Sequence, residues 1–323
     1  MKYDEFLQKL REQTCNPSDE DKFKARIAEV ANNFDGRTLD ELNKELRQIS
    51  AEHNRAPRRD FAGLSPEEMH FLLYHPLGEN SPVRLRVNIA DGVLEQISFL
   101  RLVEEFLKIV KRDGSIKLTA KLGTLPRKVL IELYDHHFIS HWPIDDGILK
   151  LRHEDDWSVL GSLHSVVRFS NLVRKVHGKL VLTKLGERML MPEHREKLFT
   201  LVLDTFTRKF SWAYNDFYPD FSLCQDAFGF SIYLLARFGK TERHKDFYAE
   251  KFLAAFPMIL AEFETESFGT PESNFLSCYK LRTFDRFLEW FNFVNVRHEK
   301  ETARTRTGSL VKRNEIMDAV FVL

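Results

Sequence analysis

The sequence is poor in cysteine and has no excess of either charge. Its three cysteines, Cys15, Cys224 and Cys278, lie far apart, which excludes a disulfide framework and a CxxC metal pair. The 48 Lys and Arg residues balance 48 Asp and Glu residues, so the formal net charge is zero. This balance excludes a uniformly basic nucleic-acid coat protein, although it leaves room for a local basic patch.

Long apolar runs are also missing. The chain begins MKYDEFLQKLREQ, which is charged throughout and contains no apolar core of a secretory signal. Apolar stretches such as 230–236 are far shorter than the roughly 18 residues that a membrane-spanning helix needs. We therefore expect a cytoplasmic protein with reduced thiols and no membrane partner.

Sequence motifs of common enzymes are absent as well. The sequence contains no GxSxG nucleophile motif, no glycine-rich phosphate loop and no GxGxxG dinucleotide motif. Cys224 and Cys278 stand among apolar neighbours, as inert buried thiols do. No cofactor is predicted. An enzyme whose site is assembled from distant residues remains an open alternative, because active sites are often built that way.

Phenylalanine, in contrast, is abundant. Nineteen of the 28 phenylalanines lie between Phe199 and Phe321, in a region where apolar residues recur every three or four positions. Aromatic side chains bury the most area per residue, so this pattern favours a large aromatic core in a helical C-terminal half. The alternative is an exposed surface that stacks on bases or ligands. The apolar C-terminal end, 316–323, is expected to dock on the core.

The overall prediction is a mainly α-helical, multi-helical protein in three parts. Residues 1–62 form an N-terminal helical region, 63–191 a central module, and 192–323 an aromatic-rich helical region packed on that module. Two helix starts are marked by capping boxes, Thr38 with Glu41 and Ser65 with Glu68, the second reinforced by Pro66.

The central module has the element order of a winged helix. We predict a helix over 99–110, a short strand at 116–119, a helix opened by Pro126, and a third helix over 155–169. A β-hairpin follows, with strands 172–176 and 179–182 around the turn His177-Gly178, and Thr183 then caps another helix. This is the element order of a winged helix, a helix-turn-helix variant with a β-wing: helix, strand, helix, helix, strand, turn, strand.

Four segments resemble parts of an uncharacterised bacterial protein family. They read LSPEEMHFLLYHPLGENSPVRL, IKLTAKLGTLPRKVL, LVRKVHGKLVLTKLGERML and FSWAYNDFYPDF, and the resemblance covers about residues 63–260. It implies a folded domain and a bacterial cytosolic setting. No activity is assigned to that family, so the resemblance transfers no functional residue.

Cations surround the predicted wing and the second helix of the module. Phosphate binding needs such a cluster, and the candidate nucleic-acid-binding residues are Lys117, Lys121, Arg127, Lys128, Arg174, Lys175, Lys179 and Lys184.

The third helix argues against that use. It begins with Glu154, Asp155 and Asp156, whose carboxylates repel phosphate. Its predicted outward residues are Ser158, Ser162, Ser165 and Arg168, a poor set for reading bases in the major groove. The leading hypothesis is therefore a non-enzymatic interaction or regulatory protein with a protein partner. Nucleic-acid binding through the wing is the alternative.

A loop rich in His and Asp, 135–153, supplies weak candidates for a metal site. His137, His141 and Asp145 are residue types that hold zinc or another transition metal. Their spacing matches no known metal motif, so an ordinary polar surface loop is favoured and no metal is predicted.

Overall fold

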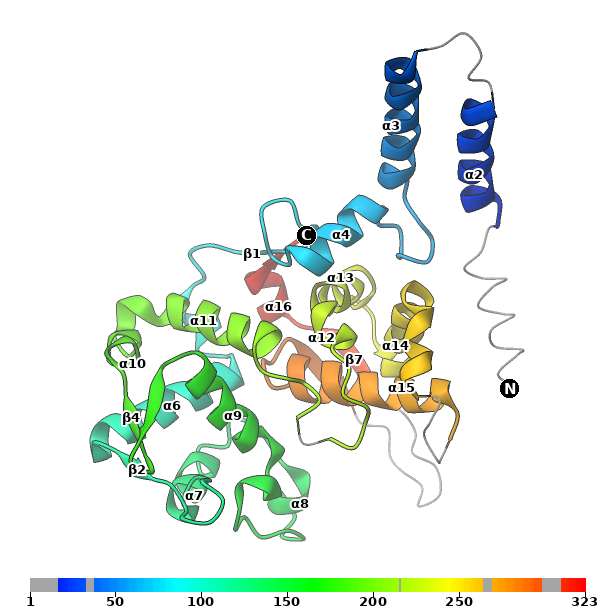
Figure 1. Ribbon diagram of the computed structural model, residues 1–323. Helices are drawn as coiled ribbons and strands as arrows, with labels where there is room; N and C mark the ends of the chain where they lie inside the picture. The colour runs from blue at the N-terminus through cyan, green and yellow to red at the C-terminus, as the bar shows by residue number, and fades with distance from the viewer. Residues whose placement is uncertain (1–16, 33–37, 215, 264–268, 298–308) are drawn as a thin grey trace.

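The computed structural model describes residues 17–32, 38–214, 216–263, 269–297 and 309–323. These residues are mainly helical and contain three small antiparallel sheets (Figure 1). Within them, every helix is too short or too polar to cross a membrane.

The N-terminal helices α2 (Pro17–Asn32) and α3 (Leu39–Arg55) lie side by side and project from the rest of the molecule (Figure 1). The predicted capping box is present: the Glu41 backbone N–H donates to the Thr38 hydroxyl, and the Thr38 N–H donates to the Glu41 carboxylate. Val30 and Ile49 are the buried apolar residues of this pair, and they lie outside the main hydrophobic core.

Helix α4 (Pro66–Tyr74) begins at Ser65, whose predicted capping box with Glu68 is also confirmed. The chain then passes through β1 (Arg84–Leu85) and α5 (Asp91–Leu94). Strand β1 pairs with the C-terminal strand β8 (Phe321–Val322), so the end of the chain docks on the core as expected.

The central part contains α6 (Ser98–Asp113), β2 (Ile116–Lys117), α7 (Arg127–Tyr134), α8 (Trp142–Asp145), the 3-10 turn η1 (Glu154–Asp156) and α9 (Ser158–Phe169). Next come β3 (Val173–Val176), β4 (Lys179–Leu182) and α10 (Lys184–Met189). The predicted hairpin is confirmed, because β3 and β4 pair in antiparallel register and β2 adds to the other edge of β4. Thr183 caps α10 by accepting the Gly186 N–H.

The C-terminal half is built from η2 (Pro192–His194), α11 (Arg195–Arg208), α12 (Leu223–Asp226), α13 (Phe228–Phe238), α14 (Lys245–Ala255), η3 (Pro257–Phe263), α15 (Pro271–Tyr279), a π-helix η4 (Lys280–Leu288) and α16 (Glu315–Val320). A sheet that sequence reasoning missed joins β5 (Arg243–His244), β7 (Leu310–Arg313) and β6 (Val294–Arg297).

One continuous hydrophobic core runs from Ala62 to Phe321. Aromatic rings join its parts. The ring centroid of Phe99 in α6 lies 5.2 Å from that of Phe206 in α11, and the Phe206 centroid lies 5.1 Å from that of Phe291 after the π-helix. Most of the C-terminal phenylalanines are buried in this core, so the core interpretation of the aromatic residues is correct. Phe217 is the clear exception, because it is fully exposed.

Helix α9 differs from the prediction. It begins at Ser158 and not near Asp155, because residues 154–156 form a separate 3-10 turn. Ser162, predicted to face outward, is 2 % exposed, and Gly161, Leu163 and His164 are buried as well. Most of the helix is buried, with α11 and α6 among its neighbours, whereas Arg168 and Phe169 at its C-terminal end are exposed.

Candidate functional site

The outer face of the central sheet carries three of the predicted cations. In the β2–β4 ladder Lys117 lies directly opposite Lys179, while the neighbouring pair, Ile116 and Leu180, is buried. Because side chains alternate between the two faces of a strand, Lys117 and Lys179 point outward. Arg174 of β3 is exposed and opposes Val181, two residues from Lys179 on the same face. We call Lys117, Arg174 and Lys179 the cation stripe.

The cation stripe has no neutralising carboxylate. In the described part of the chain, none of its three residues forms an ion pair with an acidic side chain. Like charges placed directly opposite each other destabilise an antiparallel pair. The Lys117–Lys179 pair therefore costs folding energy that an anion bound on this face would recover.

Two further predicted lysines lie at one end of this sheet. Lys175 alternates to the other face of β3, and its Nζ approaches the tight turn at Gly123, where a Cβ would stand 3.5 Å from it. Lys121 belongs to the same turn and is exposed. Cations thus lie beside the sheet as well as on it.

The remaining predicted cations, Arg127, Lys128 and Lys184, are exposed but do not belong to the cation stripe. Arg127 donates from Nε to the Leu151 carbonyl at 3.3 Å. Lys128 attracts Asp113 and Glu132 electrostatically, although the hydrogen bonds from Arg112 are the main reason why the pKa values of both carboxyls are lowered. Lys184 occupies the first turn of α10.

A buried polar pair lies beneath this surface. The Glu154 carboxylate accepts the Leu125 backbone N–H and lies 3.2 Å from Nδ1 of His164, and both side chains are at least nine-tenths buried. Tyr214 covers the same helix, because a Cβ at Gly161 would stand 2.9 Å from its ring. This pair fixes α9 to the loop before α7.

The weak metal candidates are not gathered into a ligand set. Asp145 accepts hydrogen bonds from the Tyr134 hydroxyl and, at 3.0 Å, from the His141 backbone N–H, so it acts as a local cap. Burial lowers the pKa of His141, although the Asp145 charge opposes that shift. The His137 ring packs edge-on against Tyr134. The described residues contain no group of three His, Cys, Asp or Glu side chains that could hold a metal ion.

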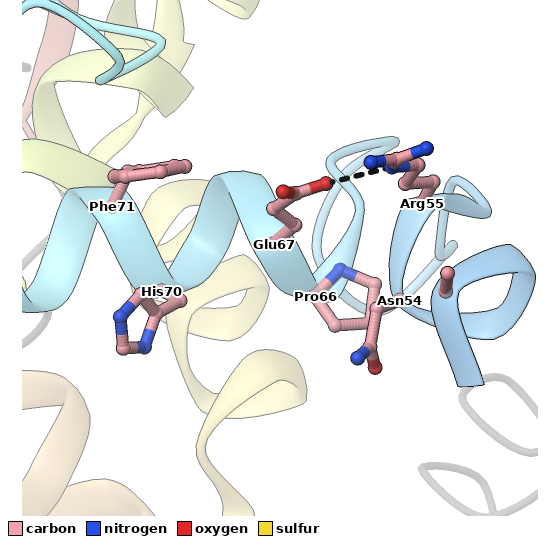
Figure 2. A pocket seen from close by; sticks show the side chains of 7 residues that line it. Asn54, Arg55, Pro66, Glu67, His70 and Phe71 are labelled. Carbon is pink, nitrogen blue, oxygen red and sulfur yellow. Dashed lines mark hydrogen bonds and ion pairs between the residues drawn. The ribbon is translucent and has the colours of Figure 1, made fainter. Parts of the chain in front are cut away.

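A cavity of about 500 Å³ lies between α3 and α4 (Figure 2). Arg55 and Glu67 form an ion pair across it at 3.3 Å, and His70 and Phe71 point to different sides of α4. Arg55 is 73 % exposed and Glu67 47 %, so this ion pair lies open to solvent where α3 meets α4.

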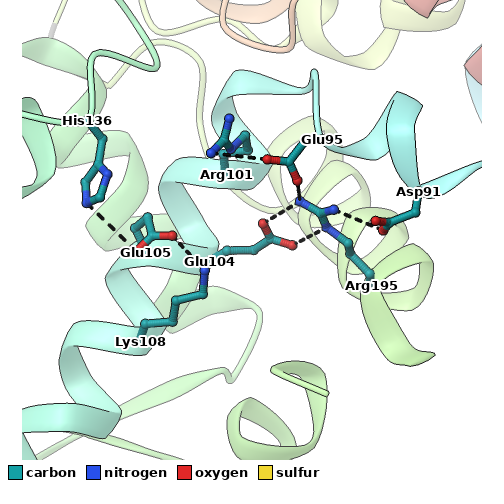
Figure 3. A network of polar contacts seen from close by, with 8 residues as sticks. All are labelled: Asp91, Glu95, Arg101, Glu104, Glu105, Lys108, His136 and Arg195. Carbon is teal, nitrogen blue, oxygen red and sulfur yellow. Dashed lines mark hydrogen bonds and ion pairs between the residues drawn. The ribbon is translucent and has the colours of Figure 1, made fainter. Parts of the chain in front are cut away.

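Arg195 is the centre of a second polar cluster (Figure 3). Its guanidinium donates to Asp91 at 3.0 Å, to Glu95 at 2.5 Å and to both oxygens of Glu104 at 2.7 and 2.9 Å. The hydrogen bonds to Glu104 are the largest cause of the raised pKa of Arg195. The cluster ties α11 to α5 and α6, so its charges are used for packing.

Sequence reasoning also missed a buried ion pair in the C-terminal half. Arg282 of the π-helix makes a bidentate contact with Asp216 at 2.8 and 3.0 Å and donates to the Pro219 and Phe221 carbonyls. Both charged side chains are almost completely buried. The residues are 66 positions apart, so spacing alone offered no signal.

Cys224 and Cys278 are buried free thiols, as predicted. Burial raises the pKa of both, that of Cys278 to about 12, so neither is an activated nucleophile. Comparison with protein-family models, with curated proteins and with solved structures gives no match for the chain.

Proposed function

We propose that this chain is a non-enzymatic binding protein that holds an anionic macromolecule on the outer face of its central sheet. The observation that carries the proposal is the cation stripe, in which Lys117 faces Lys179 and neither forms an ion pair with a carboxylate of the described residues. A like-charged cross-strand pair is unfavourable in the free protein and becomes favourable when an anion bridges it.

The proposal includes a winged-helix-like architecture for residues 63–191. It is supported by the element order α6, β2, α7, α8, η1, α9, β3, β4, in which the short α8 and η1 lie between the second and third helices of the motif, and by the sheet order β2–β4–β3. In this arrangement the hairpin is the wing, and α9 has the position of a third helix that packs inward. A cytoplasmic, bacterial setting and kinship with an uncharacterised bacterial family belong to the same proposal.

Binding of two simple polyanions tests this function. Fluorescence anisotropy with labelled polyglutamate and labelled duplex DNA measures the affinity of the full chain at low salt. We expect at least one polyanion to bind, and we expect K117Q/K179Q to weaken that binding about ten-fold or more, because two unpaired charges are removed.

The matched control is K44Q/K240Q, which removes two exposed lysines outside the central sheet. It has the same net charge as the test variant, so any difference between the two reports the position of the charge. Equal weakening by both variants, or no binding of either polyanion at low salt, would overturn the proposed function.

A further inference from the structure

The face around the cation stripe contains lysine and arginine but no aromatic anchor. Its other outward positions on the paired strands are Val176 and Val181, both half-buried. Protein–protein interfaces are depleted in lysine and depend on buried aromatic residues at their centre. Contacts to phosphate, in contrast, come from lysine and arginine without apolar help. The composition of this face therefore favours phosphate over an acidic protein surface.

The same composition distinguishes duplex from single-stranded nucleic acid. Proteins that hold single strands stack exposed bases on aromatic side chains, and the outer face of the central sheet offers none. A duplex presents its phosphates outward and needs no stacking partner. Its backbone can therefore lie across a positively charged sheet face.

The burial of α9 determines whether this helix could recognise the base sequence of a bound duplex. A reading helix must enter the major groove, but α9 is buried from Val159 to His164, and Ser162 is 2 % exposed. Tyr214 closes one side of this helix at Gly161. The exposed side chains of α9, Arg168 and Phe169, lie at its C-terminal end. The buried part of the helix cannot reach base edges while the core is intact, so we expect no sequence reading from it.

We infer that the cation stripe binds the phosphodiester backbone of duplex nucleic acid without reading its sequence. This inference rests on the proposed function and names its partner. Lys117, Lys179 and Arg174 come from three adjacent strands about 5 Å apart. They cross the sheet diagonally and contact phosphates, while the exposed Lys121 in the turn that follows β2 adds positive charge beside the sheet.

The test compares four labelled probes with the full chain over a range of salt concentrations. The probes are two duplex DNAs of unrelated sequence, one single strand of equal length, and polyglutamate of matched charge. We expect the two duplexes to bind equally, the single strand and polyglutamate to bind at least ten-fold more weakly, and duplex affinity to fall steeply with salt.

Variants of the stripe give the quantitative signature. Each phosphate contact contributes about 0.9 to the slope of log affinity against log salt. K117Q/K179Q should therefore lower that slope by about 1.8, whereas K44Q/K240Q leaves it unchanged. Circular dichroism of both variants confirms that a lower slope does not reflect unfolding.

The outcomes separate this inference from the proposed function. If polyglutamate binds as tightly as duplex with the same dependence on Lys117 and Lys179, the duplex inference is wrong and the anion-binding function stands. A ten-fold preference for one duplex sequence, or tighter binding of the single strand, also overturns the inference. If no probe binds at low salt, both proposals fall.

Discussion

At the scale of single residues, the contacts between residues distant in the chain are the most informative. Asp216 and Arg282 form a bidentate pair whose side chains are 1 % and 0 % exposed. Such a pair does not by itself imply high stability, since removing two charges from water costs several kcal/mol. Loss of one partner is costly, however, because it leaves the other charge buried and uncompensated.

Asp216→Ala is therefore expected to lower the free energy of unfolding by about 3–5 kcal/mol. Urea denaturation of the full chain measures this change. Asp204→Ala is the control: Asp204 pairs with Arg208 on the surface at 3.5 Å, and its loss should barely move the midpoint. If the two variants had the same midpoint, the structural role assigned to the buried pair would be wrong.

At the scale of elements, the helix caps were the features that the sequence predicted most reliably. Thr38, Ser65 and Thr183 cap the helices that the sequence assigned to them, because a cap depends on residues only three positions apart. The helix that begins at Pro271 changes at Lys280 from α15 to a π-helix. Arg282 of the π-helix is held by a distant loop, so local spacing could not predict this change.

Gly186 illustrates how packing reverses a local expectation. Alanine has the higher helix propensity, so α10 taken alone would gain from Gly186→Ala. In the fold, a Cβ at this position would stand 2.2 Å from the Leu172 carbonyl oxygen. We therefore expect Gly186→Ala to destabilise the protein by about 1–3 kcal/mol, which thermal unfolding can measure.

Gly92→Ala in α5 is the matched control, because a Cβ there would meet no atom within 4 Å. It should leave the melting temperature unchanged or raise it slightly. A Gly186→Ala variant as stable as the Gly92→Ala variant would show that α10 does not pack closely on the Leu172 carbonyl before β3.

At the scale of the whole molecule, the two parts predicted as 63–191 and 192–323 share one hydrophobic core. Phe99 meets Phe206, Arg195 binds carboxylates of α5 and α6, and β1 pairs with β8. The N-terminal helices contribute only Val30 and Ile49 to the buried apolar residues, and these lie outside that core. The three-part division of the chain stays a prediction.

The shared core predicts that residues 63–323 unfold together while α2 and α3 open more easily. In native-state hydrogen exchange, amides of α6 and α11 should exchange only through global unfolding, whereas those of α2 and α3 should exchange with much smaller opening energies. Calorimetry should show a single main transition. Two transitions that separate α6 from α13 would contradict the shared core.

The candidate site was partly predictable. The alternation of 172–182 placed Lys179 and Arg174 on a hairpin, which the structure confirms. The pairing of Lys117 with Lys179 could not be read from the sequence, because it joins strands 62 residues apart and depends on the register of β2 on β4. The burial of Ser162 was missed because helical spacing identifies one apolar face and cannot show that a second element covers the other.

The sequence by itself determined the helical class, the caps and the hairpin, since each depends on neighbours within a few residues. Tertiary structure alone decided the cross-strand lysine pair, the covered α9, the Arg282–Asp216 contact and the second sheet. Those features depend on which distant segments meet, and contacts of that kind are set by the packing of the whole core.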